Sequence, residues 1–197
     1  MSLRRDHGDA HFLTSRATIE GGAVGTSNEK AAMEFNLIDI GSMAHAYMQM
    51  FGPKRQREGF REWGRAYPKS AIFLVDTFGD SIQGVRDAIA VAQEMETWGN
   101  GARLYGIRFD SGDQVKLSQM ARKMFEEAGL HYVKIVSSND LEEDKITDLL
   151  RQGARIDVFG VGTSMGTGGE QATLDVQVVP SDGTRYCRST INGKVTR

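Results

Sequence analysis

The sequence has little cysteine and no long apolar run, and each scarcity excludes a class of protein. Its one cysteine, Cys187, cannot form a disulfide within the chain. The longest apolar stretches, such as residues 71–75, have the length of strands, far short of the roughly 18 to 20 residues that a membrane-spanning helix requires. The first six residues are too charged for a signal peptide. We therefore expect a protein of the reducing cytoplasm with no membrane partner.

An excess of charge of one sign is also lacking. The 197 residues carry 24 basic and 26 acidic side chains, for a net charge of −2. Such a chain has no concentrated positive field for nucleic acid and no polybasic block for anionic lipid. Nucleic acid is therefore not an expected partner. With about 150 residues per domain as a prior, the length allows one large domain, or one and a half small ones, with a sizeable core.

Glycine, by contrast, is abundant, and six short apolar runs are mostly continuous, which is typical of parallel strands buried on both faces. The 23 glycines fall mainly at the ends of these runs, where turns and phosphate-binding loops occur. The expected strands are residues 37–40, 71–75, 104–109, 132–136, 156–161 and 174–179. Their number is too small for a full eight-stranded barrel.

Segments with helical spacing lie between these runs, at residues 85–95 and 117–128. A third helix is expected after residues 138–140, with a capping box from Asn139 to Glu142 and a left-handed cap at Gly153. The alternation of strands and helices predicts the α/β class, as a barrel or an open doubly wound sheet.

Charged side chains stand at the ends of two of these runs. Asp76 follows residues 71–75, while Arg108, Asp110, Ser111 and Asp113 end the run at 104–109 and open a helix. A buried strand has no packing use for this charge, which must be paired or hold a ligand. The two strand-end carboxylates are suited to Mg²⁺ or ribose hydroxyls, and the guanidinium to a carboxylate or phosphate. The alternative is a salt bridge with helix caps from Ser111 and Asp113.

Two further blocks predict anion sites or helix caps. Thr26-Ser27-Asn28 offers hydroxyl, amide and backbone N–H groups at the start of a helix, where an ordinary N-cap is the simpler interpretation. Gly160-Val161-Gly162-Thr163 ends a strand and can form a backbone nest for an anion. His45 follows the run at 37–40, where active sites of α/β proteins collect, although a lone histidine is more often structural.

In their order and spacing, these blocks resemble the nicotinate phosphoribosyltransferase family. The resemblance extends from about Gly21 to Val179. It implies an irregular α/β barrel of the type II phosphoribosyltransferase class, incomplete here because family chains are much longer, so the chain is identified as a truncated or fragmentary member. We accordingly divide it into an N-terminal remnant or expression-derived segment at 1–20, a barrel portion at 21–180, and a hairpin or the start of a truncated region at 181–197.

The resemblance implies that nicotinate is joined to C1 of phosphoribosyl pyrophosphate, giving nicotinate mononucleotide and pyrophosphate for NAD synthesis, with coupled ATP hydrolysis. Charge builds on the sugar and on pyrophosphate as the C1–oxygen bond lengthens, so Mg²⁺, carboxylates and anion donors are needed. Asp76 and Asp110 match the family's sugar and Mg²⁺-pyrophosphate positions, and Arg108 matches its base-and-phosphate position. His45 matches the histidine that ATP phosphorylates.

The remaining substrate-binding candidates are a polar set from the same blocks. Among them, the glycine loop (residues 160–163) matches the position that holds the 5′-phosphate. The set consists of Thr26, Ser27, Asn28, Ser111, Asp113, Gly160, Gly162 and Thr163.

Two alternatives to an active enzyme remain open at this stage. The chain is an incomplete fragment that keeps phosphate binding or acts as an assembly module, or it is an unrelated barrel lyase or isomerase for a sugar phosphate. The family resemblance also implies a homodimer in the complete enzyme. There, the region absent from this chain supplies an aromatic side chain that stacks on nicotinate.

Overall fold

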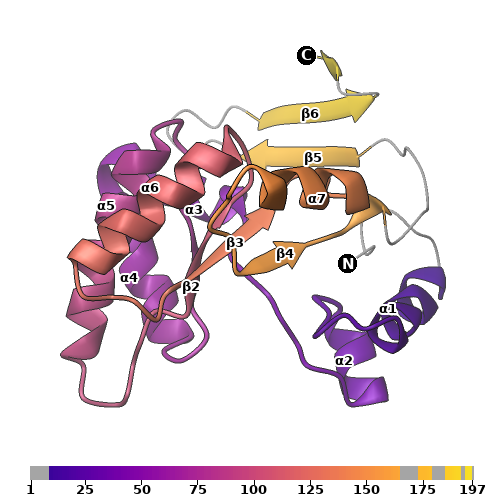
Figure 1. The fold of residues 1–197 in the computed structure, drawn as a ribbon, viewed down its shortest axis with the longest axis horizontal. Coiled ribbons are helices and arrows are strands. Elements are labelled where there is room, and N and C mark those ends of the chain that lie inside the picture. The colour runs from indigo at the N-terminus through magenta and orange to yellow at the C-terminus, as the bar shows by residue number, and fades with distance from the viewer. Residues whose placement is uncertain (1–8, 165–172, 179–184, 192–193, 197) are drawn as a thin grey trace.

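Four short parallel strands form the centre of the fold, in the order β1-β2-β3-β4. The structure, a computed structural model, describes residues 9–164, 173–178, 185–191 and 194–196. The strands are β1 (Ile72–Leu74), β2 (Gly106–Phe109), β3 (Lys134–Ser138) and β4 (Val158–Gly160). Their register pairs Ile72 with Gly106, Gly106 with Lys134, and Val136 with Val158. The sheet is open and fits the expected α/β fold as an incomplete barrel (Figure 1).

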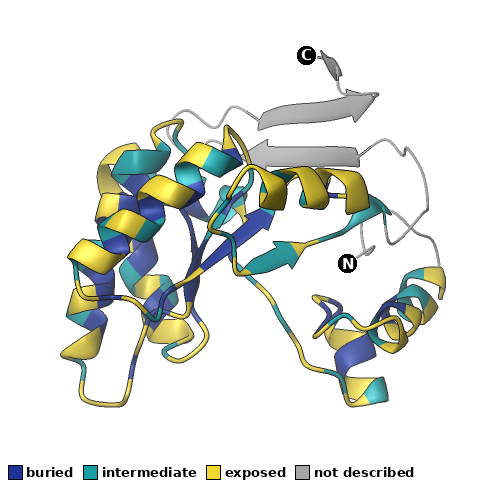
Figure 2. Ribbon diagram, viewed as in Figure 1, coloured by how far each residue is buried: buried dark blue, intermediate teal, exposed yellow. Residues whose placement is uncertain are grey.

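Helices cover this sheet, since β1, β2 and β3 are each followed by a helix, and the helices after β1 and β2 have buried apolar faces. They include α5 (Ser81–Glu96), α6 (Gln114–Glu127) and α7 (Glu143–Arg151), while α3 (His45–Phe51), the short 3-10 helix η1 (Pro53–Arg55) and α4 (Gln56–Ala66) precede β1. The buried side of α5 and α6 meets the buried central strands (Figure 2). Phe60 of α4 stacks on Phe73 of β1, with ring centroids 4.6 Å apart. Both rings are fully buried.

The first turn of α5 lies unusually close to the end of β1. At Gly84, a Cβ atom would stand 1.9 Å from the carbonyl oxygen of Val75. Only glycine leaves room for this approach. The backbone of α5 therefore supports the chain immediately before Asp76.

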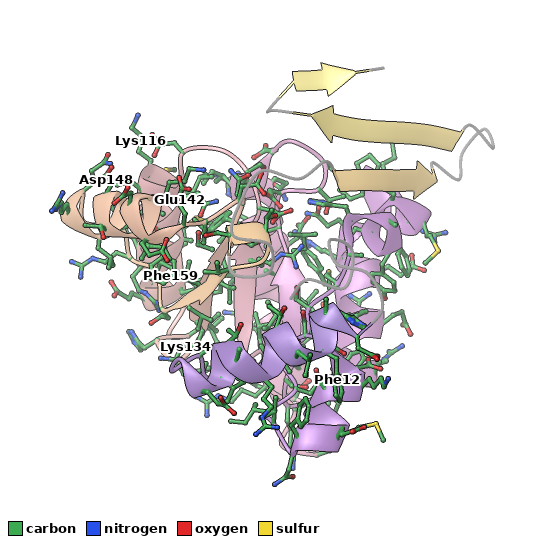
Figure 3. The ribbon with its side chains drawn as sticks, turned by 90° about the vertical axis from the view of Figure 1, so that its right-hand side faces the viewer. Phe12, Lys116, Lys134, Glu142, Asp148 and Phe159 are labelled. Carbon is green, nitrogen blue, oxygen red and sulfur yellow. The ribbon has the colours of Figure 1, made fainter. Side chains whose placement is uncertain are left out.

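A separate helical pair precedes the sheet, formed by α1 (Ala10–Glu20) and α2 (Glu29–Phe35). Phe12 of α1, labelled in Figure 3, contacts Phe35 of α2 with ring centroids 4.3 Å apart. Thr26 forms an isolated parallel bridge with Asp39. None of these helices, nor any other helix in the described ranges, is long and apolar enough to cross a membrane.

Two of the expected parallel strands are wrong. Residues 37–40 form only the bridge to Thr26, because no neighbouring strand extends the ladder, and Ile38 is 65% exposed. Residues 174–179 fall largely in β5 (Thr173–Val178), which pairs antiparallel with β6 (Arg185–Ile191) in a second sheet completed by β7 (Lys194–Thr196). A short connection favours this antiparallel pairing. Of the hairpin expected at 181–197, residues 181–184 lie outside the described residues.

The helix starts expected from sequence also needed correction. The proposed capping box at Asn139 does not form, because Asn139 and Asp140 have φ values of 131° and 47° and the chain turns before α7 begins. Glu142 is the N-cap and makes no side-chain capping bond. The left-handed position of Gly153, with φ 78°, is confirmed. Helices α1, α3 and α4 were not expected, and the divisions at residues 20 and 180 stay predictions.

Candidate active site

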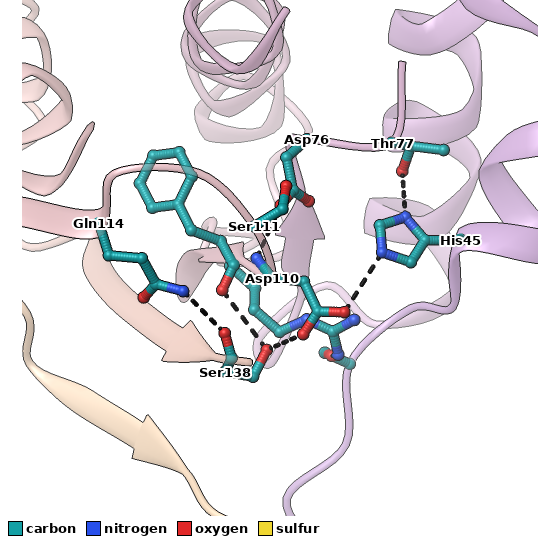
Figure 4. Close-up of polar contacts among 10 residues, drawn as sticks. His45, Asp76, Thr77, Asp110, Ser111, Gln114 and Ser138 are labelled. Carbon is teal, nitrogen blue, oxygen red and sulfur yellow. Dashed lines mark hydrogen bonds and ion pairs between the residues drawn. The ribbon is translucent and has the colours of Figure 1, made fainter. Parts of the chain in front are cut away.

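Polar side chains gather where the parallel strands end. Asp76 follows β1, Asp110 follows β2, Ser138 is the last residue of β3, and Gly160 is the last residue of β4. Parallel neighbours end at the same edge of a sheet, so four segments distant in sequence converge there. Figure 4 shows the side chains from the first three of these strand ends in one cluster, with His45 beside them.

Asp76 is the most deeply buried acid of the cluster, with 6% of its surface exposed. Its Oδ2 accepts hydrogen bonds from the backbone N–H of Asp110 and from the hydroxyl of Ser111, both at 2.7 Å. Its Oδ1 is buried and has no hydrogen-bond partner among the residues that the structure describes. Leaving a buried acceptor unsatisfied costs roughly 1–3 kcal/mol, so such an atom invites a donor or a cation.

Asp110 is held by donors on two sides. Its Oδ2 lies 3.3 Å from His45 Nε2, and its Oδ1 accepts from the hydroxyl of Ser138. Burial by itself raises the pKa of this carboxyl, but the His45 contact, the charge of Arg108 and the Ser138 hydroxyl together bring it well below its ordinary value. Asp110 is therefore a carboxylate at neutral pH.

The ionised state of Asp110 fixes the proton on His45. A carboxylate only accepts hydrogen bonds, so Nε2 of His45 carries the hydrogen that faces it. Nδ1 lies 3.1 Å from the hydroxyl of Thr77, and in the neutral ring it accepts from that hydroxyl. His45 is the first residue of α3 rather than part of a strand end. Because Nε2 carries the hydrogen, Nδ1 carries the lone pair and is the nucleophilic atom of the ring.

Arg108 lies on β2, two residues before Asp110. Its Nη1 donates to the hydroxyl of Ser42, in the loop that leads to His45. This contact ties the loop before α3 to the central strand. The guanidinium thereby adds a fixed positive charge to a cluster that otherwise contains two carboxyls and an imidazole.

Some of the predicted site residues have structural partners instead. Asn28 caps α2 by accepting from the N–H of Ala31 at 3.2 Å, and Thr26 accepts from the N–H of Asn28 at 3.1 Å. Asp113 caps α6 by accepting from the N–H of Lys116 at 3.1 Å. These bonds are the capping alternative considered for both blocks. Ser111 contacts Asp76 and so belongs to the cluster.

The glycine loop lies two strands away from Asp110 along the same edge. Gly160 pairs with Ser138 in the β3–β4 register, and Gly162 and Thr163 follow it. A Cβ at Gly162 would have open space around it. The loop therefore borders the carboxylate cluster through the end of β3. Ser27 lies between Thr26 and Asn28, in the segment before α2.

The donor set suits a magnesium ion shared with a substrate. Over the described residues, no group of three or more His, Cys, Asp or Glu side chains could hold a metal ion alone. Mg²⁺ commonly takes one or two carboxylates and completes its coordination with water and substrate phosphates. The unpartnered Oδ1 of Asp76, beside the ionised Asp110, fits that pattern.

Sequence analysis missed the roles of Gln114 and Ser42 at this edge. Gln114 donates from Nε2 to the carbonyl of Ser138 at 2.8 Å and accepts from the hydroxyl of Ser137. Ser42 meets Arg108 across 66 positions. These contacts span distant segments, so no local pattern signals them. The one available signal is a glutamine that opens an amphipathic helix at the inner, buried position.

The chain is similar in sequence to nicotinate phosphoribosyltransferases. The model of the nicotinate phosphoribosyltransferase (NAPRTase) family matches residues 4–184. The nicotinate phosphoribosyltransferase of Bacillus subtilis is 41% identical over 172 residues, which cover 87% of this chain and 34% of that protein. The enzyme of the same name from Dictyostelium discoideum is 32% identical, over 97% of this chain and 38% of that protein. The chain thus spans little more than a third of the length of these relatives.

Solved structures share the fold at lower sequence identity. The crystal structure of human nicotinic acid phosphoribosyltransferase superposes with a TM-score of 0.72 at 22% identity, covering 100% of this chain and 52% of that one. The nicotinate-nucleotide pyrophosphorylase of Pyrococcus furiosus gives a TM-score of 0.65 at 21% identity, covering 98% and 53%. At such identities the likeness is one of fold.

Proposed function

The chain belongs to the nicotinate phosphoribosyltransferase family, and we propose that its strand ends form part of an active site that joins nicotinate to phosphoribosyl pyrophosphate. The products are nicotinate mononucleotide and pyrophosphate, a step of NAD synthesis. The observation that carries the proposal is the pair of carboxyls at Asp76 and Asp110, one with a buried free oxygen and one held ionised. They adjoin a glycine loop suited to the 5′-phosphate.

In this proposal Asp76 and Asp110 hold Mg²⁺ together with the pyrophosphate group. When bound, the ion neutralises negative charge on the leaving group as the C1–oxygen bond breaks. Asp110 also keeps the imidazole of His45 oriented, and Ser111 with the Asp110 backbone N–H keeps Asp76 in place. The chain's own part is thus to fix two carboxylate positions before the substrate arrives.

The coupled ATP hydrolysis is assigned to His45. Nδ1 attacks the γ-phosphorus of ATP, an N–P bond forms, and the bond to the ADP oxygen breaks, leaving a phosphohistidine. Asp110 stabilises the ring through Nε2–H, and Thr77 gives up its hydrogen bond to Nδ1 as that atom reacts. The phosphoryl group adds negative charge beside the Mg²⁺-pyrophosphate site.

Arg108 is the proposed partner of the nicotinate carboxylate. Its anchor on Ser42 supports that role, because a fixed guanidinium recognises a carboxylate better than a mobile one. The remaining predicted substrate residues, including those of the Thr26-Ser27-Asn28 block, stay proposals. A cytoplasmic location is supported by the single cysteine of the sequence, and a homodimer of the whole enzyme by the family resemblance.

The test must allow for the length of the chain, which covers 34% of its Bacillus subtilis relative. Formation of nicotinate mononucleotide should be measured with this chain alone and with the remaining region of a relative supplied in trans. Product from the combined preparation, lost in Asp76→Asn, supports the proposal. Phosphoribosyl pyrophosphate binding without turnover in either preparation supports the alternative, a phosphate-binding or assembly module. No binding and no product contradicts both.

A further inference from the structure

We propose that Gln114 is a positioning residue that sets the place of Asp110 and of the glycine loop by holding the end of β3. Gln114 is the first residue of α6 and is 7% exposed. A buried amide has to place both its donor and its acceptor. The donor of Gln114 meets Ser138 and its acceptor meets Ser137, and these two residues are consecutive in β3.

The two bonds hold two consecutive residues of β3. Nε2 of Gln114 donates to the carbonyl of Ser138 at 2.8 Å, and Oε1 accepts from the hydroxyl of Ser137, which is 1% exposed. A side chain gripped at both ends in a buried place has little freedom to move. The carbonyl of Ser138, at the end of β3, is therefore held by the side chain of Gln114 (Figure 4).

The turn that follows Ser138 has an unfavourable backbone conformation. Asn139 has φ 131° and Asp140 has φ 47°, both in the region that side chains other than glycine seldom adopt. Such backbone persists only where surrounding contacts over-determine it. The Gln114 bond to the Ser138 carbonyl fixes the plane from which this turn starts, so it is one of those contacts.

Two functional elements depend on the same strand end. The hydroxyl of Ser138 donates to Oδ1 of Asp110, and Ser138 is paired with Gly160, the start of the glycine loop. Movement of Ser138 therefore changes the orientation of the carboxylate and the position of the loop together. Gln114 touches neither of them, and acts through Ser138. The inference rests on the proposed function for its consequence, but not for its geometry.

The chain offers a matched control on the same helix. Gln119 also donates from Nε2 to a backbone carbonyl, that of Gly153, at 2.9 Å, but it is exposed and lies away from the strand ends. Methionine has nearly the length of glutamine and keeps the helix, so Gln114→Met and Gln119→Met remove comparable bonds at two places. Gln114→Glu has the shape of glutamine, keeps an oxygen for Ser137 and replaces the donor to Ser138 with an acceptor, which provides a second variant.

The first measurement needs no ligand. In ¹H–¹⁵N spectra of the 197-residue chain, Gln114→Met and Gln114→Glu should shift the amide signals of Ser138, Asn139, Asp110 and Gly160, whereas Gln119→Met should affect the surroundings of Gly153. Shifts confined to α6 in the Gln114 variants would overturn the proposal. Thermal unfolding of each variant establishes that the compared chains are folded. If Gln114→Met does not fold, the amide shifts of Gln114→Glu decide whether Gln114 positions Ser138.

The second measurement is calorimetric binding of phosphoribosyl pyrophosphate with Mg²⁺. Loss of the buried bonds should weaken affinity about ten-fold in Gln114→Met and leave Gln119→Met unchanged. Because Gln114 acts on Asp110 through Ser138, the loss of affinity in Gln114→Met combined with Ser138→Ala should be smaller than the sum of the two single losses. Fully additive losses contradict the proposal. If the unaltered chain binds no ligand, the proposed function fails, while the amide shifts still decide the role of Gln114.

Discussion

Replacing Gly84 with alanine tests whether the close approach of α5 to β1 holds Asp76 in place. The added Cβ would stand 1.9 Å from the carbonyl oxygen of Val75, whereas Cβ atoms in proteins essentially never come within 3.0 Å of such an atom. Helix or strand must therefore move by about 1 Å. Val75 immediately precedes Asp76, whose two hydrogen bonds at 2.7 Å do not tolerate that shift.

The magnitude follows from three contributions. Overpacking costs about 1–3 kcal/mol, and weakening two hydrogen bonds costs about 1 kcal/mol each. Alanine regains about 1 kcal/mol of helix propensity. The net expectation for Gly84→Ala is a loss of roughly 2–4 kcal/mol of unfolding free energy, which for a chain of this size lowers Tm by roughly 4–16 °C.

The assay is thermal and urea unfolding followed by circular dichroism, combined with calorimetric binding of phosphoribosyl pyrophosphate and Mg²⁺. Gly21→Ala is the control, because its added Cβ would meet its nearest neighbours at an ordinary 3.4 Å, so little change is expected. A Gly84→Ala protein with unchanged stability and unchanged binding would show that the close approach does not constrain Asp76, and would refute the reasoning.

Three further residues give predictions of their own. Asp110→Asn should bind phosphoribosyl pyrophosphate with Mg²⁺ at least ten-fold more weakly, because the metal loses an anionic ligand; unchanged affinity in a folded variant removes Asp110 from the site. The pKa of Asp110 is lowered in the fold, so its contribution to stability is complete above the ordinary value near 4 and declines as pH falls below it. The unfolding free energy should therefore vary less between pH 5 and pH 3 in Asp110→Asn than in the unaltered chain. An equal variation in the two chains speaks against the lowered pKa. With the remaining region of a relative supplied, Arg108 should favour nicotinate over nicotinamide by up to several kcal/mol. Arg108→Gln should lower the ratio of kcat/KM for nicotinate to kcat/KM for nicotinamide. Equal use of the two bases by the unaltered enzyme rules out this role of Arg108. With ATP, acid-labile phosphate should appear on His45 only when the missing region is present and should be lost in His45→Ala, whereas strong labelling of the isolated chain would contradict the fragment interpretation.

The sequence predicts the central sheet well because burial on both faces produces continuous apolar runs. Residues 71–75 and 104–109 contain β1 and β2, and the spacing at 85–95 and 117–128 locates α5 and α6. Residues 37–40 show the limit of that signal, since an apolar run becomes a strand only where another strand is available to pair. Pairing partners are not visible in a local pattern.

Helix α4 shows a different limit. Its sequence contains several charges, and its buried face has helical spacing but few large apolar side chains, because Gln56, Gly59 and Gly64 share that face with Phe60. Its stability comes from other segments: Phe60 stacks on Phe73, and Arg61 pairs with Glu94 of α5 through two hydrogen bonds of 2.7 and 3.0 Å. Tertiary packing of this kind overrides weak propensity. The sequence alone does not contain the partner's position.

The candidate site divides in the same way between what topology dictates and what packing adds. That Asp76 and Asp110 meet follows from two parallel strands that end at one edge, and strand-end position alone predicts it. Their unequal states do not follow from it. Asp110 has donors on both oxygens, whereas Asp76 keeps one buried oxygen without a partner. Asp110 holds the imidazole in place and, because each carboxylate oxygen has a second lone pair, can still share a cation. The buried oxygen of Asp76 is suited to receiving that cation, or a hydroxyl, when the substrate arrives. The difference between the two arises from His45 and Ser138, which reach Asp110 from α3 and β3 and do not reach Asp76.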